Sequence, residues 1–226
     1  MGHFISDKHT KRKIYYACET LFYSKGYHNT HIEDIVNLAQ ITREAYDNFF
    51  SGKLEPAVMI YFALAKNNAR IAALFGNSID RLTGICLDLQ AFWHLFFRDE
   101  NIRRFSMELS AENIWRIKDT HPLYEECAAL SVRRFSEREI EWNKLANVGI
   151  ARQLNQDAYR IARDSKETSE FYIRAVFKLY EIDSALTNHI ISRSQELFER
   201  CELSNDGFRT TFRMKQQPIK SNSHEL

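Results

Sequence analysis

Apolar residues recur along this chain with the spacing of α-helices. Ile14, Cys18, Leu21 and Phe22 lie at positions i, i+4, i+7 and i+8, which places them on one face of a helix. The same kind of spacing predicts further helices over residues 54–75, 79–97, 102–117, 122–147, 156–163 and 168–201. Seven Gly and three Pro are too few for the many turns of a β-sandwich. We therefore expect an all-α protein.

Short helices are predicted within the first 55 residues by their end signals. Gly26 can end the first helix in the left-handed conformation. Thr30 and Glu33 have the spacing of a capping box, which predicts the start of a second helix. Gln40 then begins a turn, and the Thr42 hydroxyl can cap a third helix. Two short helices joined by a tight turn, with a preceding helix to complete the core, are typical of a helix-turn-helix.

This segment resembles the N-terminal part of the TetR (tetracycline repressor) family of transcription regulators. The resemblance covers residues 14–55 and needs no insertion. The matching residues are Ala17, Leu21, Phe22, Gly26, Tyr27, Thr30, Ile32, Ile35, Ala39, Ile41, Thr42, Phe50 and Lys53. The resemblance implies an N-terminal three-helix helix-turn-helix domain followed by a larger helical ligand-binding and dimerisation domain.

Three residues depart from the family pattern where DNA binding is concerned. Gln40 and Glu44 stand where the family usually has Gly, and Asp47 stands where members place a tyrosine on the DNA backbone. A carboxylate at that position repels phosphate. Residues 1–56 also carry seven Lys or Arg against seven Asp or Glu, and the whole chain has a net charge of +1. Any contact with nucleic acid must therefore come from a local patch.

Three regions are expected along the chain. They are a helix-turn-helix domain over residues 8–55, a ligand-binding and dimerisation domain over 56–204, and a mobile tail over 205–226, where periodicity is weak. No apolar stretch approaches the roughly 20 residues of a membrane span, and the N-terminus lacks the apolar core of a secretory signal. We therefore expect a cytoplasmic protein with reduced cysteines and no membrane segment.

The predicted DNA-binding residues fall into two groups. In a major groove Arg can pair with guanine, Asn with adenine, and a carboxylate with cytosine. Hydroxyls and cations nearby, including a basic arm before the first helix, would hold phosphates. The candidates are Arg43, Glu44, Asp47 and Asn48 for bases, and Lys11, Arg12, Thr30, Thr42 and Lys53 for phosphates. The alternative is that Glu44 and Asp47 only solvate a helix that has stopped reading DNA.

Aromatic side chains concentrate between residues 61 and 124, the stretch in which the TetR family builds its ligand cavity. An aromatic-lined cavity is a common site for small molecules, and here it would take a small apolar or aromatic ligand. For each single ring, ordinary core packing is the alternative. The candidate pocket residues are Phe62, Phe92, Trp93, Phe96, Phe97, Phe105, Trp115 and Tyr124.

A homodimer is expected from the last helical segment, whose apolar residues cover more than one stripe. A helix of this kind must cover two surfaces, so a second chain is one natural partner, with the helix over 122–147 contributing as well. The alternative is a fully buried central helix. The candidate interface residues are Tyr172, Val176, Leu179, Leu186, Ile190 and Leu197.

Other chemistry finds little support in the sequence. His28, His31, Glu33 and Asp34 are close together but lack the spacing of metal ligands. No phosphate-binding loop, nucleophile elbow or Cys/His catalytic arrangement occurs. We therefore expect no metal, no cofactor and no enzyme activity.

Three functions stay open at this point. The leading interpretation is a ligand-responsive transcription regulator that binds operator DNA as a dimer. The second is a TetR-like co-regulator that has lost operator binding and acts through protein–protein contacts. The third is a carrier or enzyme that uses the aromatic cavity alone, through residues distant in sequence.

Overall fold

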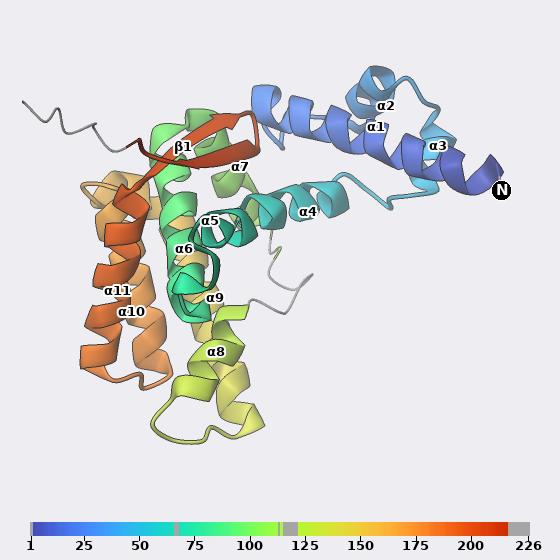
Figure 1. The fold of residues 1–226 in the computed structure, drawn as a ribbon. Coiled ribbons are helices and arrows are strands. Elements are labelled where there is room, and N and C mark those ends of the chain that lie inside the picture. The colour runs from blue at the N-terminus through green and yellow to red at the C-terminus, as the bar shows by residue number, and fades with distance from the viewer. Residues whose placement is uncertain (1, 66–67, 113, 115–121, 217–226) are drawn as a thin grey trace, which may run out of the picture.

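The structure is a computed structural model that describes residues 2–65, 68–112, 114 and 122–216. It has an N-terminal unit set off from a larger helical body (Figure 1). The N-terminal unit contains α1 (Gly2–Lys25), α2 (Ile32–Ala39) and α3 (Arg43–Asp47). The helical body contains α4 (Leu54–Ala65), α5 (Asn68–Phe75), η1 (Gly76–Ser78), α6 (Arg81–Arg98), α7 (Glu100–Ala111), α8 (Pro122–Leu130), α9 (Glu137–Ile161), α10 (Ser165–Leu179), α11 (Ser184–Glu199), β1 (Cys201–Asp206) and β2 (Arg209–Met214). Among the described helices none is long and apolar enough to cross a membrane.

The N-terminal unit is held together by the apolar stripe that the sequence predicts on its first helix. Ile14, Cys18 and Phe22 of α1 are fully buried. They share one core with Ile35 of α2 and Tyr46 of α3, which are also fully buried. Three helices packed in this order, the second and third joined by a short turn, confirm the predicted helix-turn-helix.

The start of α2 differs from the sequence prediction by one residue, whereas the start of α3 does not. The Thr42 hydroxyl caps α3 as predicted. At α2 the cap is His31, whose backbone amide donates a hydrogen bond to the Asp34 carboxylate at 3.0 Å. Thr30 is instead buried, and its hydroxyl donates to a backbone carbonyl at 2.7 Å. Acidic residues at both 33 and 34 allow either start, so spacing alone does not choose between them.

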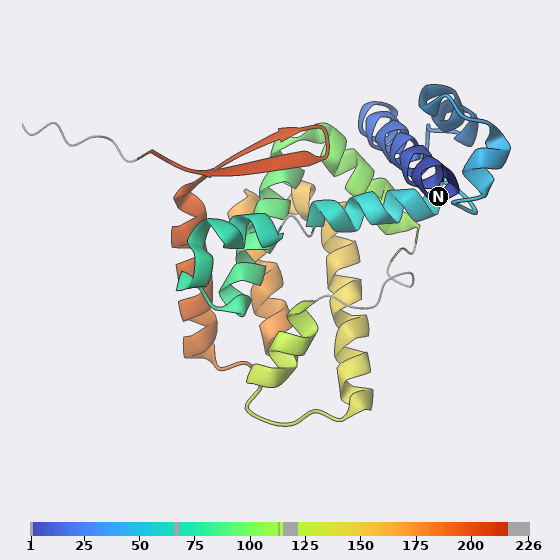
Figure 2. The same cartoon turned by 45° about the vertical axis from the view of Figure 1, so that its right-hand side comes forward.

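The helical body is organised around α6. This helix packs against α4, α5, α7, α8, α10 and α11, and the two views show it enclosed by them (Figures 1 and 2). Leu82, Cys86, Leu87, Leu95 and Phe96, from all around its circumference, are at most 2% exposed. A helix that is buried on every side belongs at the centre of a helical fold.

The predicted helix over 122–147 is wrong, because the chain breaks into α8 and α9. The Ser136 hydroxyl and the Glu139 carboxylate form a capping box that starts α9. Gly149 lies inside α9, and the predicted short helix over 156–163 is mostly the end of this same helix. Glycine weakens a helix interior by only about 1 kcal/mol, which tertiary packing readily overcomes.

Three other predicted helices also have different bounds. The segment over 168–201 divides into α10 and α11, because Glu181 takes a left-handed conformation (φ 52°) and the Asp183 carboxylate caps α11. The segment over 54–75 contains α4 and α5, separated by residues outside the described part. In the segment over 102–117, α7 ends at Ala111.

Residues 201–214 form a β-hairpin, although the sequence predicts a mobile tail over 205–226, of which residues 217–226 lie outside the described part. β1 and β2 pair in antiparallel fashion, with Cys201 opposite Met214 and Asp206 opposite Arg209. Gly207 makes the tight turn with φ 60°. Two strands of six residues give too short an alternation to stand out in a helical sequence. The prediction of an all-α fold is confirmed for the rest of the described chain.

Candidate functional site

The candidate DNA-reading helix α3 exposes the side chains that the sequence predicts, but its one cation is already engaged. Arg43, Glu44, Asp47 and Asn48 are all exposed. The Arg43 Nε lies 3.0 Å from both Asp47 carboxylate oxygens, and its Nη1 lies 2.9 Å from the Glu33 carboxylate. The hydrogen bond to Asp47 is the main reason that the pKa of Arg43 is raised. Arg43 must leave these carboxylates before it can pair with guanine.

Two of the predicted phosphate contacts are engaged inside the loop between α1 and α2. The Lys53 ammonium donates to the backbone carbonyls of Tyr27 at 2.7 Å, Thr30 at 2.8 Å and His28 at 3.3 Å. It also lies 4.4 Å from the centre of the Tyr27 ring. Burial lowers the pKa of Lys53. Lys53 therefore supports the loop, and the buried Thr30 hydroxyl has the same role.

The remaining predicted phosphate contacts are exposed. Lys11 and Arg12 lie on α1, which begins at Gly2, so the basic segment is part of a helix and not a separate arm. The Lys11 ammonium lies 5.7 Å from the Phe50 ring, beside the end of the helix-turn-helix. Thr42, the residue directly before α3, is also exposed. Free cations near the helix-turn-helix therefore come from α1.

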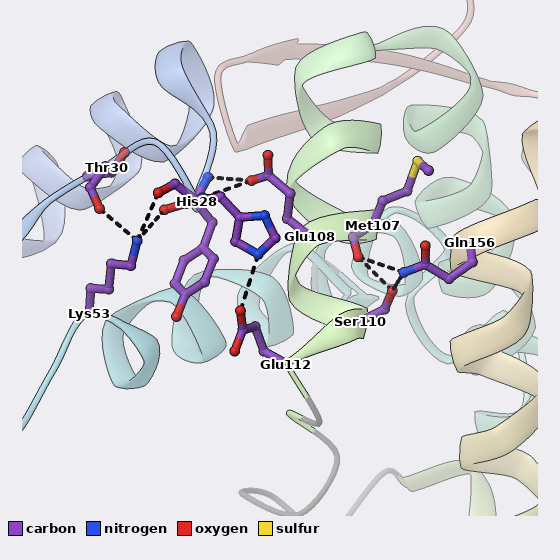
Figure 3. A network of polar contacts seen from close by, with 9 residues as sticks. His28, Thr30, Lys53, Met107, Glu108, Ser110, Glu112 and Gln156 are labelled. Atoms are coloured by element: carbon purple, nitrogen blue, oxygen red, sulfur yellow. Dashed lines mark hydrogen bonds and ion pairs between the residues drawn. The ribbon is translucent and has the colours of Figure 1, made fainter.

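The end of α1 is held by side chains of α7. The Arg104 guanidinium donates to the carbonyls of Tyr23 and Ser24 at 2.8 and 3.0 Å. The Glu108 carboxylate accepts hydrogen bonds from the backbone amides of Tyr27 and His28 at 2.5 and 3.2 Å. The two carbonyls lie in the last turn of α1, where a helix leaves its carbonyls without a partner, and the two amides lie in the loop that follows. Figure 3 shows the Glu108 contacts beside those of Lys53.

Gly26 allows this approach. It has φ 89°, and a Cβ atom there would lie 2.9 Å from a Glu108 carboxylate oxygen and 3.1 Å from the Arg104 Nε. Glu112 extends the same row on α7 and contacts the His28 imidazole at 3.2 Å. We use the name α7 seam for Arg104, Glu108 and Glu112 together with the loop between α1 and α2 that they hold.

The same helix α7 is tied to the interior of the helical body. The Gln156 amide of α9 donates to the Met107 carbonyl at 2.8 Å and also contacts the Ser110 hydroxyl (Figure 3). Two sides of α7 are thus engaged, the Glu108 side chain with the N-terminal unit and the Ser110 hydroxyl with α9. Hydrogen bonds therefore connect α9, α7 and the end of α1 in one series.

The predicted pocket aromatics do not form one lining. Phe92, Trp93 and Phe96 are buried together on α6, with ring centres 5.2 to 6.3 Å apart. Phe105 instead packs against Phe22 of α1 at the α7 seam. Phe62 is half-buried and contacts Tyr61, and Phe97 is half-buried and contacts Tyr159. Tyr124 is half-buried on α8, and Trp115 lies outside the described residues.

A polar group inside the helical body was not predicted from the sequence. Asn147 and Asn155 of α9 are each 1% exposed. The Asn147 amide donates to the Tyr124 hydroxyl at 2.6 Å, and the Asn155 amide donates to the Tyr61 hydroxyl at 3.1 Å. Tyr172 of α10 joins them: burial raises the pKa of its hydroxyl, and the nearby Tyr124 and Tyr61 raise it further. We call these five residues the tyrosine–asparagine cluster.

The tyrosine–asparagine cluster carries acceptors that have no donor. The side-chain carbonyl oxygens of Asn147 and Asn155 are buried without a hydrogen-bond partner. Each orphaned group of this kind costs about 1–3 kcal/mol, so native interiors seldom keep one. The eight-residue spacing on one helix face, among apolar residues, was a signal in the sequence that could have identified the pair.

Asp88 of α6 is a further buried acceptor in the helical body. It is 5% exposed, and its Oδ1 has no hydrogen-bond partner. Burial raises the pKa of Asp88 to about 9, so this carboxyl is neutral at pH 7. The interior thus combines aromatic surface with neutral groups that accept and donate hydrogen bonds.

The six predicted interface residues are packed within their own chain. Tyr172, Val176, Ile190 and Leu197 are buried, and Leu179 and Leu186 are half-buried against the same core. The large apolar side chains that are exposed on α9 and α10 lie elsewhere. They are Trp142 and Leu145, each 60% exposed, Tyr159 and Ile161, 52% and 63% exposed, and Phe171 of α10, 57% exposed.

Solved structures match this fold, whereas no protein-family model and no curated protein matches the sequence. RolR, solved in complex with resorcinol, aligns at a TM-score of 0.61 and 13% identity, over 83% of this chain and 95% of its own. A γ-butyrolactone receptor (ArpA-like protein) aligns at 0.45 and 17%, over 86% and 98%. CprB, a TetR family protein from S. coelicolor A3(2), aligns at 0.40 and 16%, over 86% and 98%.

RolR is a TetR-family regulator, and its alignment covers 83% of this chain and 95% of RolR. The chain has the TetR-type fold. The match confirms the resemblance read from residues 14–55 and places an N-terminal helix-turn-helix before a helical body in the TetR-type arrangement. Identity this low carries no ligand or operator from one protein to the other.

Lys53 provides a test of what its ammonium does. We expect Lys53→Met to lower the free energy of unfolding by about 1–3 kcal/mol, because three carbonyls lose a charged donor. Lys13→Met, on the half-exposed surface of α1, serves as the control and should change it little. Denaturant unfolding followed by circular dichroism measures both. Unchanged stability with weakened DNA binding would instead make Lys53 a phosphate contact.

Proposed function

We propose that this protein is a ligand-responsive transcription regulator that binds operator DNA as a dimer through its helix-turn-helix. The observation that carries the proposal is the α7 seam. Glu108 and Arg104 hold the end of α1, while the neighbouring Met107 and Ser110 contact Gln156 of α9. A ligand that displaces α9 would therefore reorient the helix on which the DNA-binding unit is built.

The proposed ligand is a small aromatic molecule that carries hydroxyl groups. RolR, which shares the fold, was solved with resorcinol, a benzene ring with two hydroxyls. In this chain the tyrosine–asparagine cluster has two buried carbonyl oxygens without a donor. Hydroxyls of a bound ligand would supply those donors, and the buried rings of Phe92 and Trp93 would contact its apolar part.

The proposed operator contact uses α3 for bases and α1 for phosphates. Exposed Lys11 and Arg12 supply charge, and Arg43 supplies a bidentate donor once it leaves Asp47. Surface ion pairs contribute only about 0–1 kcal/mol each, so the phosphate field of DNA can break this one. The arrangement of carboxylates would make binding weak in the absence of a well-matched base sequence.

A second function is favoured by the same carboxylates. Glu33, Glu44 and Asp47 surround the single cation Arg43 on the exposed surface of α2 and α3. Such a surface fits a basic protein segment better than it fits phosphate. The alternative to operator binding is thus a TetR-type co-regulator that acts through protein–protein contacts.

The dimer is proposed to form on α9 and not through the six residues predicted from the sequence. Those six already pack inside the chain, so they offer little area to a partner. Trp142 and Leu145 are one helical turn apart on α9 and expose large apolar surface, the usual composition of an interface centre.

The DNA proposal is tested by selecting from random duplex DNA at low salt and measuring affinity for the enriched sequence. Asp47→Asn removes a carboxylate and releases Arg43, so we expect the affinity to rise about fivefold, equivalent to roughly 1 kcal/mol. Glu125→Gln makes the same charge change on α8, far from the helix-turn-helix, and should leave affinity unchanged.

Two other results of this experiment change the assignment. If Asp47 accepts a hydrogen bond from cytosine, Asp47→Asn will weaken the preferred site by about 1–3 kcal/mol and relax selectivity at one base pair. If neither the wild type nor Asp47→Asn enriches any duplex, operator binding is rejected and the co-regulator takes its place.

The ligand proposal is tested by calorimetry with resorcinol as the probe and benzene as its apolar counterpart. We expect Asn155→Leu and Asn147→Leu each to weaken resorcinol binding about tenfold, because each removes one acceptor. Asn143→Leu is a matched control on the same helix, since the Asn143 amide bonds a backbone carbonyl outside the cluster. Equal binding of benzene and resorcinol would contradict a polar site.

The dimer proposal is tested by light scattering at micromolar concentration. We expect a dimer that Trp142→Glu and Leu145→Glu convert to monomers, because each places a charge in an apolar interface. Phe171→Glu is the control on α10. Dissociation by Phe171→Glu alone would move the interface to α10, and a monomeric wild type would reject the dimer.

A further inference from the structure

The C-terminal hairpin crosses from the far end of the helical body to the N-terminal unit. β1 follows directly after α11, and the two strands extend over the body so that their turn lies beside α1 (Figures 1 and 2). The base of the hairpin is fixed, because Lys215 donates from its backbone amide to the Arg200 carbonyl at 2.8 Å and from its ammonium to the Glu199 carbonyl at 2.7 Å. One end of the hairpin therefore moves with α11.

The tip of the hairpin is wedged between α1 and α7. Phe208 is only 7% exposed although it follows a turn glycine. Its ring centre lies 4.5 Å from that of Phe105 on α7 and 5.5 Å from that of Tyr23 on α1, the latter edge to face. Aromatic pairs at these separations attract one another in addition to the apolar area they bury.

Polar contacts complete the attachment of the tip. The Arg209 guanidinium lies 3.2 Å from the Glu19 carboxylate of α1. Asp99, which begins α7, accepts hydrogen bonds from the Asn205 amide of β1 at 2.7 Å and from the Tyr23 hydroxyl of α1 at 2.8 Å. The same carboxylate thus joins α1, α7 and the hairpin.

The attachment is local. Between α1 and the tip lies a surface cleft of about 270 Å³, lined by Tyr16, Glu19, Thr20 and Tyr23 on one side and by residues 206–209 on the other. Beside this cleft the hairpin tip contacts α1 through Tyr23 and Glu19.

From these contacts we infer that the C-terminal hairpin is a second coupling element, which sets the orientation of the N-terminal unit relative to the helical body. The α7 seam holds the end of α1 from one side, and the hairpin tip holds it from another. Because the base of the hairpin moves with α11, a displacement of α11 reaches α1 without passing through the ligand interior. Two attachments fix the direction of a helix that one attachment leaves free to pivot.

The test measures the distance between the two parts and uses no DNA or ligand, so it is independent of the proposed function. Spin labels are attached to the full chain at Asn37→Cys on α2 and Arg152→Cys on α9, both exposed positions. The four native cysteines are buried, so labelling can be directed to the new ones. Electron–electron double resonance then gives the distribution of the α2-to-α9 distance.

We expect Phe208→Ala to broaden that distribution at least twofold while the helical content stays the same. Arg209→Glu should broaden it as well, and adding Glu19→Arg should restore the original width by re-forming the ion pair with the charges exchanged. Arg213→Gln, opposite Glu202 on the same strand, removes a charge away from α1 and serves as the control, which should have no effect.

The inference is overturned if Phe208→Ala keeps the wild-type distribution. It is equally overturned if Arg213→Gln broadens the distribution as much as Arg209→Glu does. Should Phe208→Ala unfold the protein, the charge exchange between residues 19 and 209 decides the question by itself, since restored width requires direct contact between hairpin and α1.

Discussion

The backbone at the end of α1 needs hydrogen-bond partners, and the way it obtains them ties the two parts of the molecule together. A helix leaves its last carbonyls without partners within the helix, and the following loop adds further amides and carbonyls. Here Arg104 and Glu108 of α7 satisfy one set, and Lys53 satisfies another. Because these partners come from outside α1, the N-terminal unit cannot complete its own structure without α7. Coupling between the two parts therefore follows from the folding of the loop.

The same use of charge affects the surface that would meet DNA. Lys53, which the sequence suggests as a phosphate contact, is engaged by three carbonyls, and Arg43 is held by Asp47 and Glu33. A net charge of +1 over the chain leaves little general attraction for a polyanion. Selectivity in such a protein must then depend on a close fit of α3 to its partner, whether that partner is a base sequence or a basic protein segment.

The interior of the helical body combines two kinds of surface that are usually separated. Aromatic rings on α6 form an ordinary core, whereas α9 directs the buried amides of Asn147 and Asn155 at tyrosine hydroxyls. Polar networks with unsatisfied members are costly, so they persist where another molecule completes them. These orphaned amides, and not the number of aromatic residues, are the reason that the ligand is proposed to bind beside α9.

The sequence alone determined the helical class and the helix-turn-helix, because both depend on local periodicity and on turn residues such as Gly26 and Thr42. It did not determine the division of the chain into α8 to α11, since capping by Ser136 and Asp183 competes with apolar patterns that run across the breaks. Only the tertiary structure decided which groups Lys53 contacts and which predicted interface residues are buried. It also decided that the side-chain carbonyl oxygens of Asn147 and Asn155 lack a hydrogen-bond partner. The same holds for the hairpin, because Phe208 is ordered by Tyr23 and Phe105, which lie far from it in the sequence and meet it only when the chain is folded.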